Sequence, residues 1–319
     1  MASHAIIVRR ILLLAAVLGT LTAAPAHASF HFMQIEQVIG GVQGDVTAQA
    51  IQLRMRSPGQ SLVSIARLIA RDAAGLNPVT VVDMTTNVAT GATGSRVLVA
   101  SSAFLTRLPA VTPDFVMTSV IPASYLAAGT LTFEDDFGTV YWRLSWGGAS
   151  YLGPGTGSIS NDADGNYSPP FAGPLPSVGT QVLLFGLVAT ALGTNNAADY
   201  ALAPGTVSFV NNAGTSGSID ADADGVPNVT DNCSLVTNPT QLDADSDGYG
   251  NICDADINNS GTVTTADFGM LRSVLGLAAA SGATAAAADM NGSGTVTTAD
   301  FGLLRARLGT VPGPSGLHP

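Results

Sequence analysis

The sequence predicts a mainly β protein, in which a β-sandwich is followed by an irregular acidic stretch and a small domain of two loop–helix units. Three observations support this prediction: short alternating segments separated by turn residues, a change in composition near residue 218, and a duplicated segment towards the C-terminal end. The 319 residues are enough for two or three domains, and an apolar fraction of 46% is enough for a core.

The first 28 residues have the three parts of a secretory signal peptide. Arg9 and Arg10 precede the apolar run Ile11–Leu21, and Ala26–Ala28 forms an A-x-A cleavage site before Ser29. The alternative is an uncleaved membrane anchor, but the apolar run is short for a spanning helix. We therefore expect an exported protein, secreted or on the cell surface, with no transmembrane anchor after cleavage.

The charged residues argue against several classes of function. All 12 basic residues are Arg, and 21 of the 23 carboxylates are Asp, so the net charge is -11. Loss of Arg9 and Arg10 with the signal peptide would bring it to about -13. A chain this acidic, without a basic patch, is not expected to bind nucleic acid. Only His31 and His318 remain after cleavage, near the termini, which argues against a Ser–His–Asp triad or a histidine zinc site.

Residues 29–217 are predicted to form the β-sandwich. The segment Ala50–Arg56 alternates apolar and polar side chains, and Val140–Trp146 places Trp142 and Trp146 on one face. Clusters of Gly, Pro, Asn and Asp separate such segments, as in a sandwich of short strands. Two stretches are ambiguous and could instead be helical, namely Ser61–Arg71 and Pro122–Ala128. Further strand candidates are Phe30–Ile39, Arg96–Ala100 and Thr206–Val210.

The composition changes near Asn211–Ile219, a small and polar segment of the kind that links domains. Between Asp220 and Asp300 there are 12 Asp and one Arg, so like charges should repel. The two cysteines, Cys233 and Cys253, both lie in this acidic region. An even pair in an exported protein predicts a disulfide.

A segment of 21 residues occurs twice in the acidic region, at Asp256–Gly276 and Asp289–Gly309, with 16 identical positions. Each copy has oxygen side chains at positions 1, 3, 5, 9 and 12, glycine at position 6, and a Thr backbone carbonyl at position 7. This is the ligand spacing of a calcium loop. The predicted ligands are Asp256, Asn258, Ser260, Thr262, Thr264 and Asp267 in the first copy, and Asp289, Asn291, Ser293, Thr295, Thr297 and Asp300 in the second.

A helix is expected after each loop, because apolar residues recur there at i, i+3 and i+7. Neither apolar face can be buried alone, so the two helices are expected to pack on each other. The faces consist of Phe268, Leu271 and Leu275 in the first helix, and of Phe301, Leu304 and Leu308 in the second.

The duplicated unit, over about residues 254–309, resembles a type I dockerin, a family with two calcium loops that are each followed by a helix. The resemblance implies calcium as cofactor and a cohesin module as partner. Ser260 and Ser293 stand where the family often has Asp, so each loop has two carboxylates, which balance one Ca²⁺ and favour modest affinity. A calcium-folded module without a cohesin partner is the alternative. The resemblance implies partner contacts at Thr265, Ala266, Arg272, Thr298, Ala299 and Arg305.

The preceding stretch, residues 220–256, resembles thrombospondin type 3 repeats, because it has two D-x-D-x-D-G runs and the cysteine pair. The resemblance implies a calcium-wrapped stalk with little apolar core, stapled by Cys233–Cys253. Closing a loop of this length stabilises by about 3 kcal/mol. Asn251 replaces an Asp that is common in the family, which puts one ligand in question. The implied ligands are Asp220, Asp222, Asp224, Asp231, Asp243, Asp245, Asp247, Asn251 and Asp254.

Three further patterns in the β region have a structural alternative. Tyr141, Trp142, Trp146 and Tyr151 would suit a sugar-stacking platform, but alternating aromatics also form sandwich cores. The carboxylates of Phe133–Gly138 would suit a glycosidase acid pair, but neighbours in sequence point in different directions and suit a turn. Residues 161–166 contain a D-x-D-G without a partner at position 12, so a solvated turn is expected. The segments FMQIEQVIGG and AIQLRMR also resemble lamin-tail-like sandwich domains over too short a match to imply function.

The sequence thus predicts an exported calcium-binding protein, in which a stalk (218–255) and a helical tether (256–309) hold a β-sandwich that binds or displays a ligand. Residues 310–319 are expected to form a flexible tail. Because all ligands lie after residue 219, calcium removal is expected to unfold residues 220–309 and to leave the sandwich intact. The alternative is a polysaccharide-degrading enzyme of the glycoside hydrolase type, or a carbohydrate-binding component, that carries a dockerin. The lack of a usable His and of a clear acid pair favours a non-enzymatic role.

Overall fold

The computed structural model describes residues 30–108, 111–154, 169–179, 181–191, 196–204 and 208–318. We divide them into the β domain (30–217), the stalk (218–255), the helical domain (256–309) and the tail (310–318). The predicted signal peptide and the turn at 161–166 lie outside the described residues. None of the helices in the described ranges is long and apolar enough to span a bilayer.

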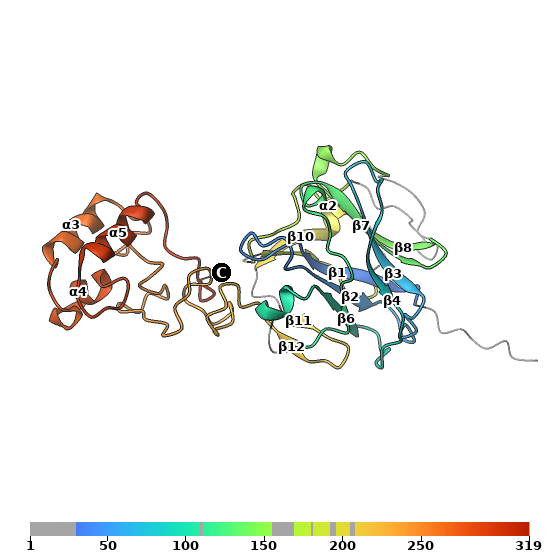
Figure 1. Ribbon diagram of the computed structural model, residues 1–319, viewed down its shortest axis with the longest axis horizontal. Coiled ribbons are helices and arrows are strands. Elements are labelled where there is room, and N and C mark those ends of the chain that lie inside the picture. Colours follow the sequence, from blue (N-terminus) through green and yellow to red (C-terminus); the bar gives the residue numbers. More distant parts are fainter. Residues whose placement is uncertain are drawn as a thin grey trace, which may run out of the picture.

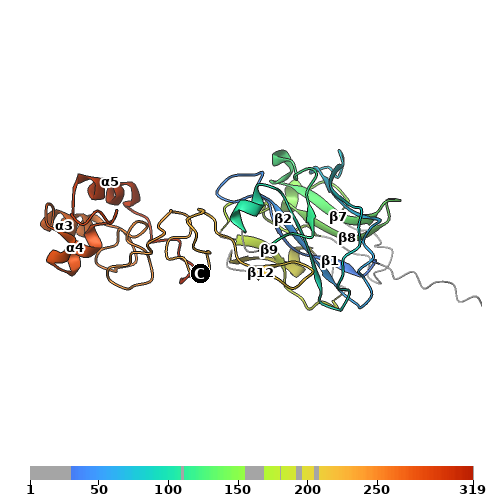
Figure 2. The same cartoon turned by 60° about the horizontal axis from the view of Figure 1, so that its bottom comes forward.

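The molecule is elongated. The β domain and the helical domain lie at opposite ends, and the irregular stalk joins them (Figure 1). Figure 2 shows the same arrangement after rotation, with the stalk as the connection between the two ends.

Two sheets form a sandwich, which confirms the predicted mainly β fold class. The six-stranded sheet has the order β10-β9-β1-β2-β5-β6, and the four-stranded sheet has the order β4-β3-β7-β8. All these pairs are antiparallel except β5–β6. The strands are β1 (Met33–Ile39), β2 (Ala50–Met55), β3 (Ala66–Arg71), β4 (Val79–Met84), β5 (Arg96–Ala100), β6 (Phe115–Val116), β7 (Gly129–Asp135), β8 (Val140–Trp146), β9 (Gln181–Phe185) and β10 (Tyr200–Pro204), with a separate hairpin of β11 (Phe209–Val210) and β12 (Ser216–Gly217).

The first core lies between the two sheets and follows the alternation of the sequence. The indole N–H of Trp142 donates to the hydroxyl of Tyr200 at 2.8 Å, and that of Trp146 donates to the carbonyl of Tyr125 at 2.9 Å. Burial therefore leaves neither indole N–H unpaired. This core includes Ile51, Leu53 and Met55 from β2 and Trp142, Leu144 and Trp146 from β8.

The two ambiguous segments are not helical. Ser61–Arg71 contains β3, in which alternate residues enter the first core while Arg67 and Arg71 form ion pairs with Glu134 of β7. The period of two therefore decides the conformation, because it matches a strand between a core and a polar face. Pro122–Ala128 contains only the short 3₁₀ turn Ala123–Tyr125.

A second core covers the outer face of the six-stranded sheet. It is built from the sheet, from the chain around the 3₁₀ turn Phe104–Arg107, and from the β11–β12 hairpin. The rings of Phe104 and Phe209 meet edge to face with centroids 5.3 Å apart. Ile219 and Ala221 are fully buried in the same core. The segment expected to link two domains therefore belongs to the packing of the β domain.

The helical domain has the predicted pair of packed helices, α3 and α5. The rings of Phe268 and Phe301 lie 5.3 Å apart, and Leu271 and Leu304 belong to the core of this domain. Leu275 is 47% and Leu308 is 50% exposed, because both lie beyond the last helical residue. A third helix, α4, was not predicted. The bounds are α3 (Thr265–Ser273), α4 (Ala283–Ala288) and α5 (Thr298–Arg307); a short α2 (Asn196–Asp199) lies in the β domain.

The tail, which was expected to be flexible, turns back along the stalk, so that the C-terminal end lies at the middle of the molecule (Figure 1). The ring of His318 stacks on that of Tyr249 at a centroid distance of 4.7 Å. The stalk has few regular backbone pairs of its own, and the tail supplies partners for it. The backbone bonds run from Gly313 N to Cys253 O (3.2 Å), from Ser234 N to Pro314 O (3.0 Å) and from Gly316 N to Asp231 O (2.8 Å).

Candidate metal centres

Four loops in the stalk and the helical domain share one twelve-residue register. In each loop Asp occupies positions 1 and 12, and Gly occupies position 6. The N–H at position 6 donates to Oδ2 of the position-1 Asp in all four, at 3.1, 3.0, 2.5 and 2.7 Å. We call them loop 1 (Asp220–Asp231), loop 2 (Asp243–Asp254), loop 3 (Asp256–Asp267) and loop 4 (Asp289–Asp300).

The backbone turns in the same way in all four loops. Position 4 has a φ between 54 and 65°, and the glycine at position 6 has a φ between 87 and 95°. Two left-handed residues bend the chain sharply, and only glycine adopts the second conformation without strain. The turn brings positions 1, 3 and 5 to a common centre, as calcium requires. The residues are Ala223, Ser246, Asn259 and Gly292 at position 4, and Gly225, Gly248, Gly261 and Gly294 at position 6.

The carboxylates of loops 1 and 2 converge. In each loop the Asp side chains at positions 1, 3 and 5 have oxygens within 4.8 Å of one another. Asp220 Oδ1, Asp222 Oδ2 and Asp231 Oδ2 are buried and have no hydrogen-bond partner among the described residues. A buried carboxylate oxygen without a partner is costly unless a cation compensates it. The three convergent carboxylates of each loop therefore fit Ca²⁺, which prefers oxygen ligands.

Crowding of charge also affects the pKa values in the stalk. Burial and the neighbouring Asp224 raise the pKa of Asp222 to about 7. Burial and the neighbouring Asp247 raise the pKa of Asp254 to about 7. A bound divalent cation would favour the ionised forms and offset this repulsion.

Loops 3 and 4 have the same internal bonds. Oδ1 of the position-12 Asp accepts from the position-3 N–H at 3.1 Å in both, and Oδ2 accepts from the position-9 N–H at 2.7 Å in both. The position-9 Thr also caps the following helix, so the closing ligand and the helix start form one structure. The residues at positions 3, 5, 7, 9 and 12 are Asn258, Ser260, Thr262, Thr264 and Asp267 in loop 3, and Asn291, Ser293, Thr295, Thr297 and Asp300 in loop 4.

The structure gives Asn251 a different role from the ligand role that the resemblance implies. Its Oδ1 accepts from the N–H of Ala244 at 2.8 Å. Its Nδ2 donates to the carbonyls of Ala286 at 2.8 Å and Asp289 at 3.3 Å, both in the helical domain. An amide can donate these bonds, whereas an ionised Asp cannot.

The shared register also identifies two positions absent from the sequence prediction. Position 7, which supplies a backbone carbonyl in such loops, holds Val226 in loop 1 and Tyr249 in loop 2. The signal was present in the sequence, because both stalk loops repeat the spacing of Asp at positions 1 and 12.

The predicted disulfide is present between Cys233 and Cys253, with an S–S distance of 2.04 Å. Cys233 is the second residue after loop 1, and Cys253 is the last residue but one of loop 2. The bond therefore joins the ends of the two stalk loops.

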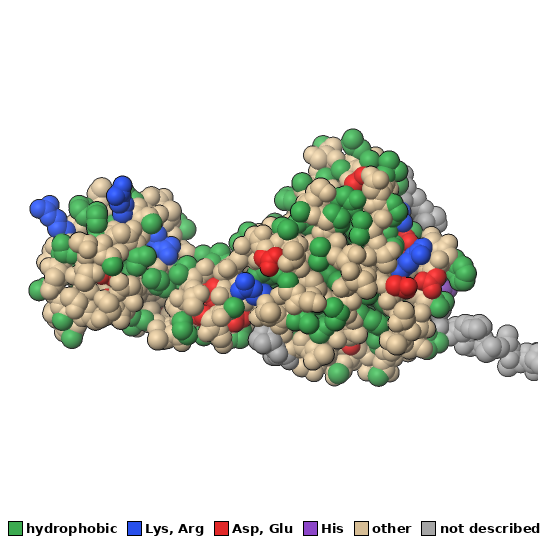
Figure 3. All heavy atoms as spheres, viewed as in Figure 1, with side chains coloured by type: hydrophobic (Ala, Val, Ile, Leu, Met, Phe, Trp, Pro, Cys, Tyr) green, Lys and Arg blue, Asp and Glu red, His purple; other side chains and the backbone are tan. Residues whose placement is uncertain are grey.

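Loop 1 is anchored to the β domain. Arg107 Nη1 donates to the carbonyl of Ala221 at 2.7 Å, and Asp220 N donates to the carbonyl of Arg107 at 2.9 Å. Asn228 Nδ2 donates to the carbonyl of Gly179 at 3.2 Å. Figure 3 shows acidic side chains over the stalk next to the β domain. The first candidate calcium centre is thus attached to the second core.

The residues at the implied partner positions lie on the surface of the helical domain. All six are exposed, at the starts and along the lengths of α3 and α5. Between these helices lies an apolar hollow of about 260 Å³, lined by Phe268, Leu271, Arg272, Leu275, Thr298 and Phe301. Figure 3 shows basic side chains at this end of the molecule. The six residues at the partner positions are Thr265, Ala266, Arg272, Thr298, Ala299 and Arg305.

The candidate sugar and acid sites of the β domain have structural roles instead. The four aromatic side chains proposed as a platform are buried, with exposures of 0 to 7%. Glu134 is 1% exposed and pairs with Arg67 and Arg71. Asp135 closes the β7–β8 turn, because its Oδ1 accepts from the N–H groups of Phe137 and Thr139. Within Phe133–Gly138, therefore, the geometry does not form an acid pair across a cleft. The aromatic residues are Tyr141, Trp142, Trp146 and Tyr151.

The fold and the four loops define a multidomain calcium-binding protein. Comparison with known families agrees: residues 254–309 match the dockerin type I domain, and residues 218–241 match the thrombospondin type 3 repeat. Both are calcium-binding families, in the predicted order, and dockerin domains bind cohesins. No curated protein matches the chain.

Proposed function

We propose that this is an exported protein whose stalk and helical domain attach the β domain to a cohesin-type partner in a calcium-dependent way. The observation that carries the proposal is the exposed apolar hollow between α3 and α5. It lies between two copies of the same surface, each with Thr-Ala at a helix start and an exposed Arg one to two turns later.

The chemistry of this surface suits a protein partner. Apolar hollows of this kind accept a side chain, and flanking Arg residues are common at interface centres. Arg272 and Arg305 carry positive charge on a chain with a net charge of -11, so they favour an acidic rim on the partner. Calcium is needed because α3 and α5 start at the closing ligands of loops 3 and 4.

The β domain is the part that we propose to be displayed. It joins the stalk through buried contacts rather than a flexible linker, so its orientation relative to the stalk is set by packing.

The export step rests on the predicted signal peptide, and N-terminal sequencing of the protein from the culture fluid or envelope should find Ser29 first. A protein that retains residues 1–28 would contradict it.

The tether is tested by capture. The full chain is used as bait for envelope and culture-fluid extract, in calcium and in chelator, and captured proteins are identified by mass spectrometry. We expect a protein with a cohesin-type module in calcium only. The double variant Ala266→Arg/Ala299→Arg, which adds bulk at the two predicted contact positions in the first turns of α3 and α5, should abolish capture. Ala280→Arg is the matched control, since Ala280 is exposed and lies outside both helices. Capture that survives the double variant, or no calcium-dependent cohesin-type partner, would refute the proposal.

A further inference from the structure

Position 9 of each stalk loop holds a buried Asn that bonds in two directions. In loop 1 it is Asn228, 2% exposed, and in loop 2 it is Asn251, 5% exposed. Within its own loop, each Oδ1 accepts from the N–H at position 2, at 2.8 Å in both cases. The two side chains thus make the same internal bond.

The amide groups of these residues point out of the loops, to opposite neighbours. Nδ2 of Asn228 donates to Gly179 in the β domain. Nδ2 of Asn251 donates to Ala286 and Asp289 in the helical domain, and Asp289 is position 1 of loop 4. One side chain therefore bonds both to the backbone of its calcium loop and to the backbone of the adjoining domain.

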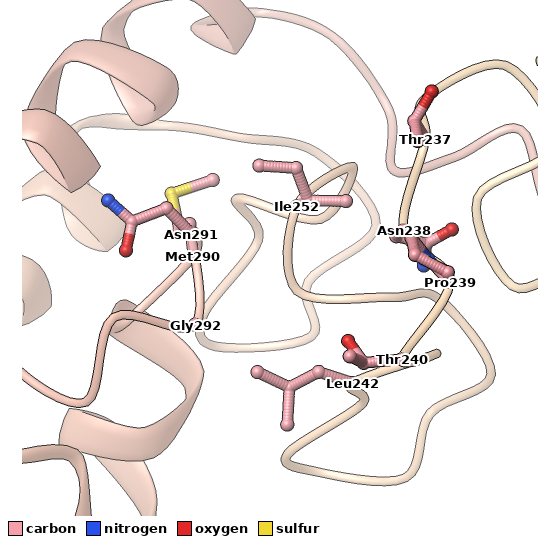
Figure 4. A pocket seen from close by; sticks show the side chains of 9 residues that line it. All are labelled: Thr237, Asn238, Pro239, Thr240, Leu242, Ile252, Met290, Asn291 and Gly292. Atoms are coloured by element: carbon pink, nitrogen blue, oxygen red, sulfur yellow. The ribbon is translucent and has the colours of Figure 1, made fainter. Parts of the chain in front are cut away.

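Packing at the second junction supports the same connection. Figure 4 shows Leu242 and Ile252 of the stalk facing Met290 and Gly292 across a pocket of about 210 Å³. Gly292 is position 4 of loop 4, and a Cβ on it would lie 3.3 Å from Leu242. Loop 2 and loop 4 are therefore neighbours in space although 46 residues separate their first ligands, Asp243 and Asp289.

We propose that Asn228 and Asn251 couple calcium binding in the two stalk loops to the two flanking domains. Calcium orders the backbone of a stalk loop, which fixes the N–H at position 2 and with it the orientation of the Asn amide. The ordered amide then satisfies carbonyls of the next domain. Through Asn251, occupancy of loop 2 favours the conformation of loop 4 that binds calcium. By linkage, occupancy of loop 4 favours loop 2 by the same factor.

The choice of Asn over Asp is what makes the coupling work. An Asp at position 9 would keep the oxygen that accepts from position 2, but would replace the donor with a negative charge beside carbonyl oxygens. It would also add a carboxylate to the calcium loop itself. The Asn therefore gives up a charged ligand within the loop for a connection to the next domain. This inference does not depend on a cohesin-type partner, because it concerns calcium binding alone.

The test is a calcium titration of the full chain, in which hydrogen exchange and mass spectrometry follow each loop separately. The midpoint of a loop is the calcium concentration at which its hydrogen exchange is half-way between the two limits. In Asn251→Asp the midpoint of loop 4 should rise by about fivefold or more, which is the lower end of the coupling factors typical between two binding sites. The midpoint of loop 2 should rise less than that of loop 4, because the added carboxylate in its ligand set offsets the lost coupling. A purely structural role of Asn251 would instead weaken loop 2, its own loop, more than loop 4.

Asn228→Asp is the matched control. It should leave the midpoint of loop 4 in place and instead lower the melting temperature of the β domain, followed by tryptophan fluorescence. Asn251→Asp should raise the midpoint of loop 4 and leave the melting temperature of the β domain unchanged. Asn251→Ala, which introduces no charge, should shift loop 4 in the same direction as Asn251→Asp. An unmoved midpoint of loop 4 in both Asn251 variants, or equal shifts of loop 4 in the Asn228 and Asn251 variants, would overturn the proposal.

Discussion

Calcium removal should destabilise the β domain, although the candidate ligands all lie outside its sheets. The carboxylate oxygens of Asp220, Asp222 and Asp224 in loop 1 lie within 4.8 Å of one another, so we expect the loop to keep its shape only when a cation offsets their charges. Without the ion the loop opens, and Ile219 and Ala221 leave the second core. This expectation differs from the one drawn from the ligand positions alone, which predicts an intact sandwich.

The magnitude follows from the contacts that would be lost. Burial of a side chain such as Ile219 contributes about 1.5–3 kcal/mol. The hydrogen bonds from Arg107 to Ala221 and from Asn228 to Gly179 contribute about 0.5–1.5 kcal/mol each. The free energy of unfolding of the β domain should therefore fall by about 2.5–6 kcal/mol. For a domain of this size that corresponds to about 5–24 °C in melting temperature.

The assay is tryptophan fluorescence during heating, with calcium and with chelator. It reports on the β domain alone, because the chain has two Trp and both, Trp142 and Trp146, are buried in its first core. In calcium, Asp231→Asn in loop 1 should lower the midpoint, and Asp300→Asn at the same position of loop 4 should not. Coincident melting curves with and without chelator would refute the reasoning, as would equal effects of the two variants.

Three further outcomes are expected. Because the pKa of Asp222 and that of Asp254 are raised to about 7, protons compete with calcium below that pH. The calcium affinity of the stalk should therefore fall as the pH is lowered from 8 to 6, by calorimetry, while the calcium-free stalk should become more stable; a pH-independent affinity would contradict this. Replacing Cys233 and Cys253 with Ser should lower the unfolding free energy of the stalk by about 3 kcal/mol in denaturant titrations at saturating calcium, and an unchanged midpoint would count against the staple. Deleting residues 311–319 removes backbone bonds to Asp231, Ser234 and Cys253 of the stalk. It should lower the thermal midpoint of the far-UV signal of the C-terminal region in calcium; a tail without a structural role would leave that midpoint unchanged.

The sequence predicts those parts of the structure that depend on local chemistry. Gly261 and Gly294 mark a backbone turn that only glycine adopts without strain, so the duplicated loops can be recognised from spacing alone. The alternation in Val140–Trp146 likewise predicts a strand whose apolar side chains enter a core, and β8 confirms it with the same bounds. In both cases the signal repeats at the period of the structure.

Other parts depend on contacts that the local sequence does not record. Asn211–Ile219 is small and polar like a linker, yet it holds the β11–β12 hairpin and a residue of the second core, because tertiary packing overrides composition. The helix α4 has almost only Ala, which favours helix but gives no amphipathic pattern, so its two buried residues could not be chosen in advance. The tail has Gly and Pro, as a flexible segment would, and its order comes from stalk backbone groups that need partners.

The same distinction explains Asn251. As a family position it suggests a weakened ligand, because an amide replaces a carboxylate. As a position in this structure it has a donor directed at two carbonyls of the helical domain, and those partners lie 35 and 38 residues away in the chain. A stalk between two domains must connect to both of them, and calcium ions held by the candidate ligands would not do so directly, since those ligands lie within each loop. Side chains that belong to a loop but bond outside it can, and Asn228 and Asn251 are placed to do this at opposite ends of the stalk.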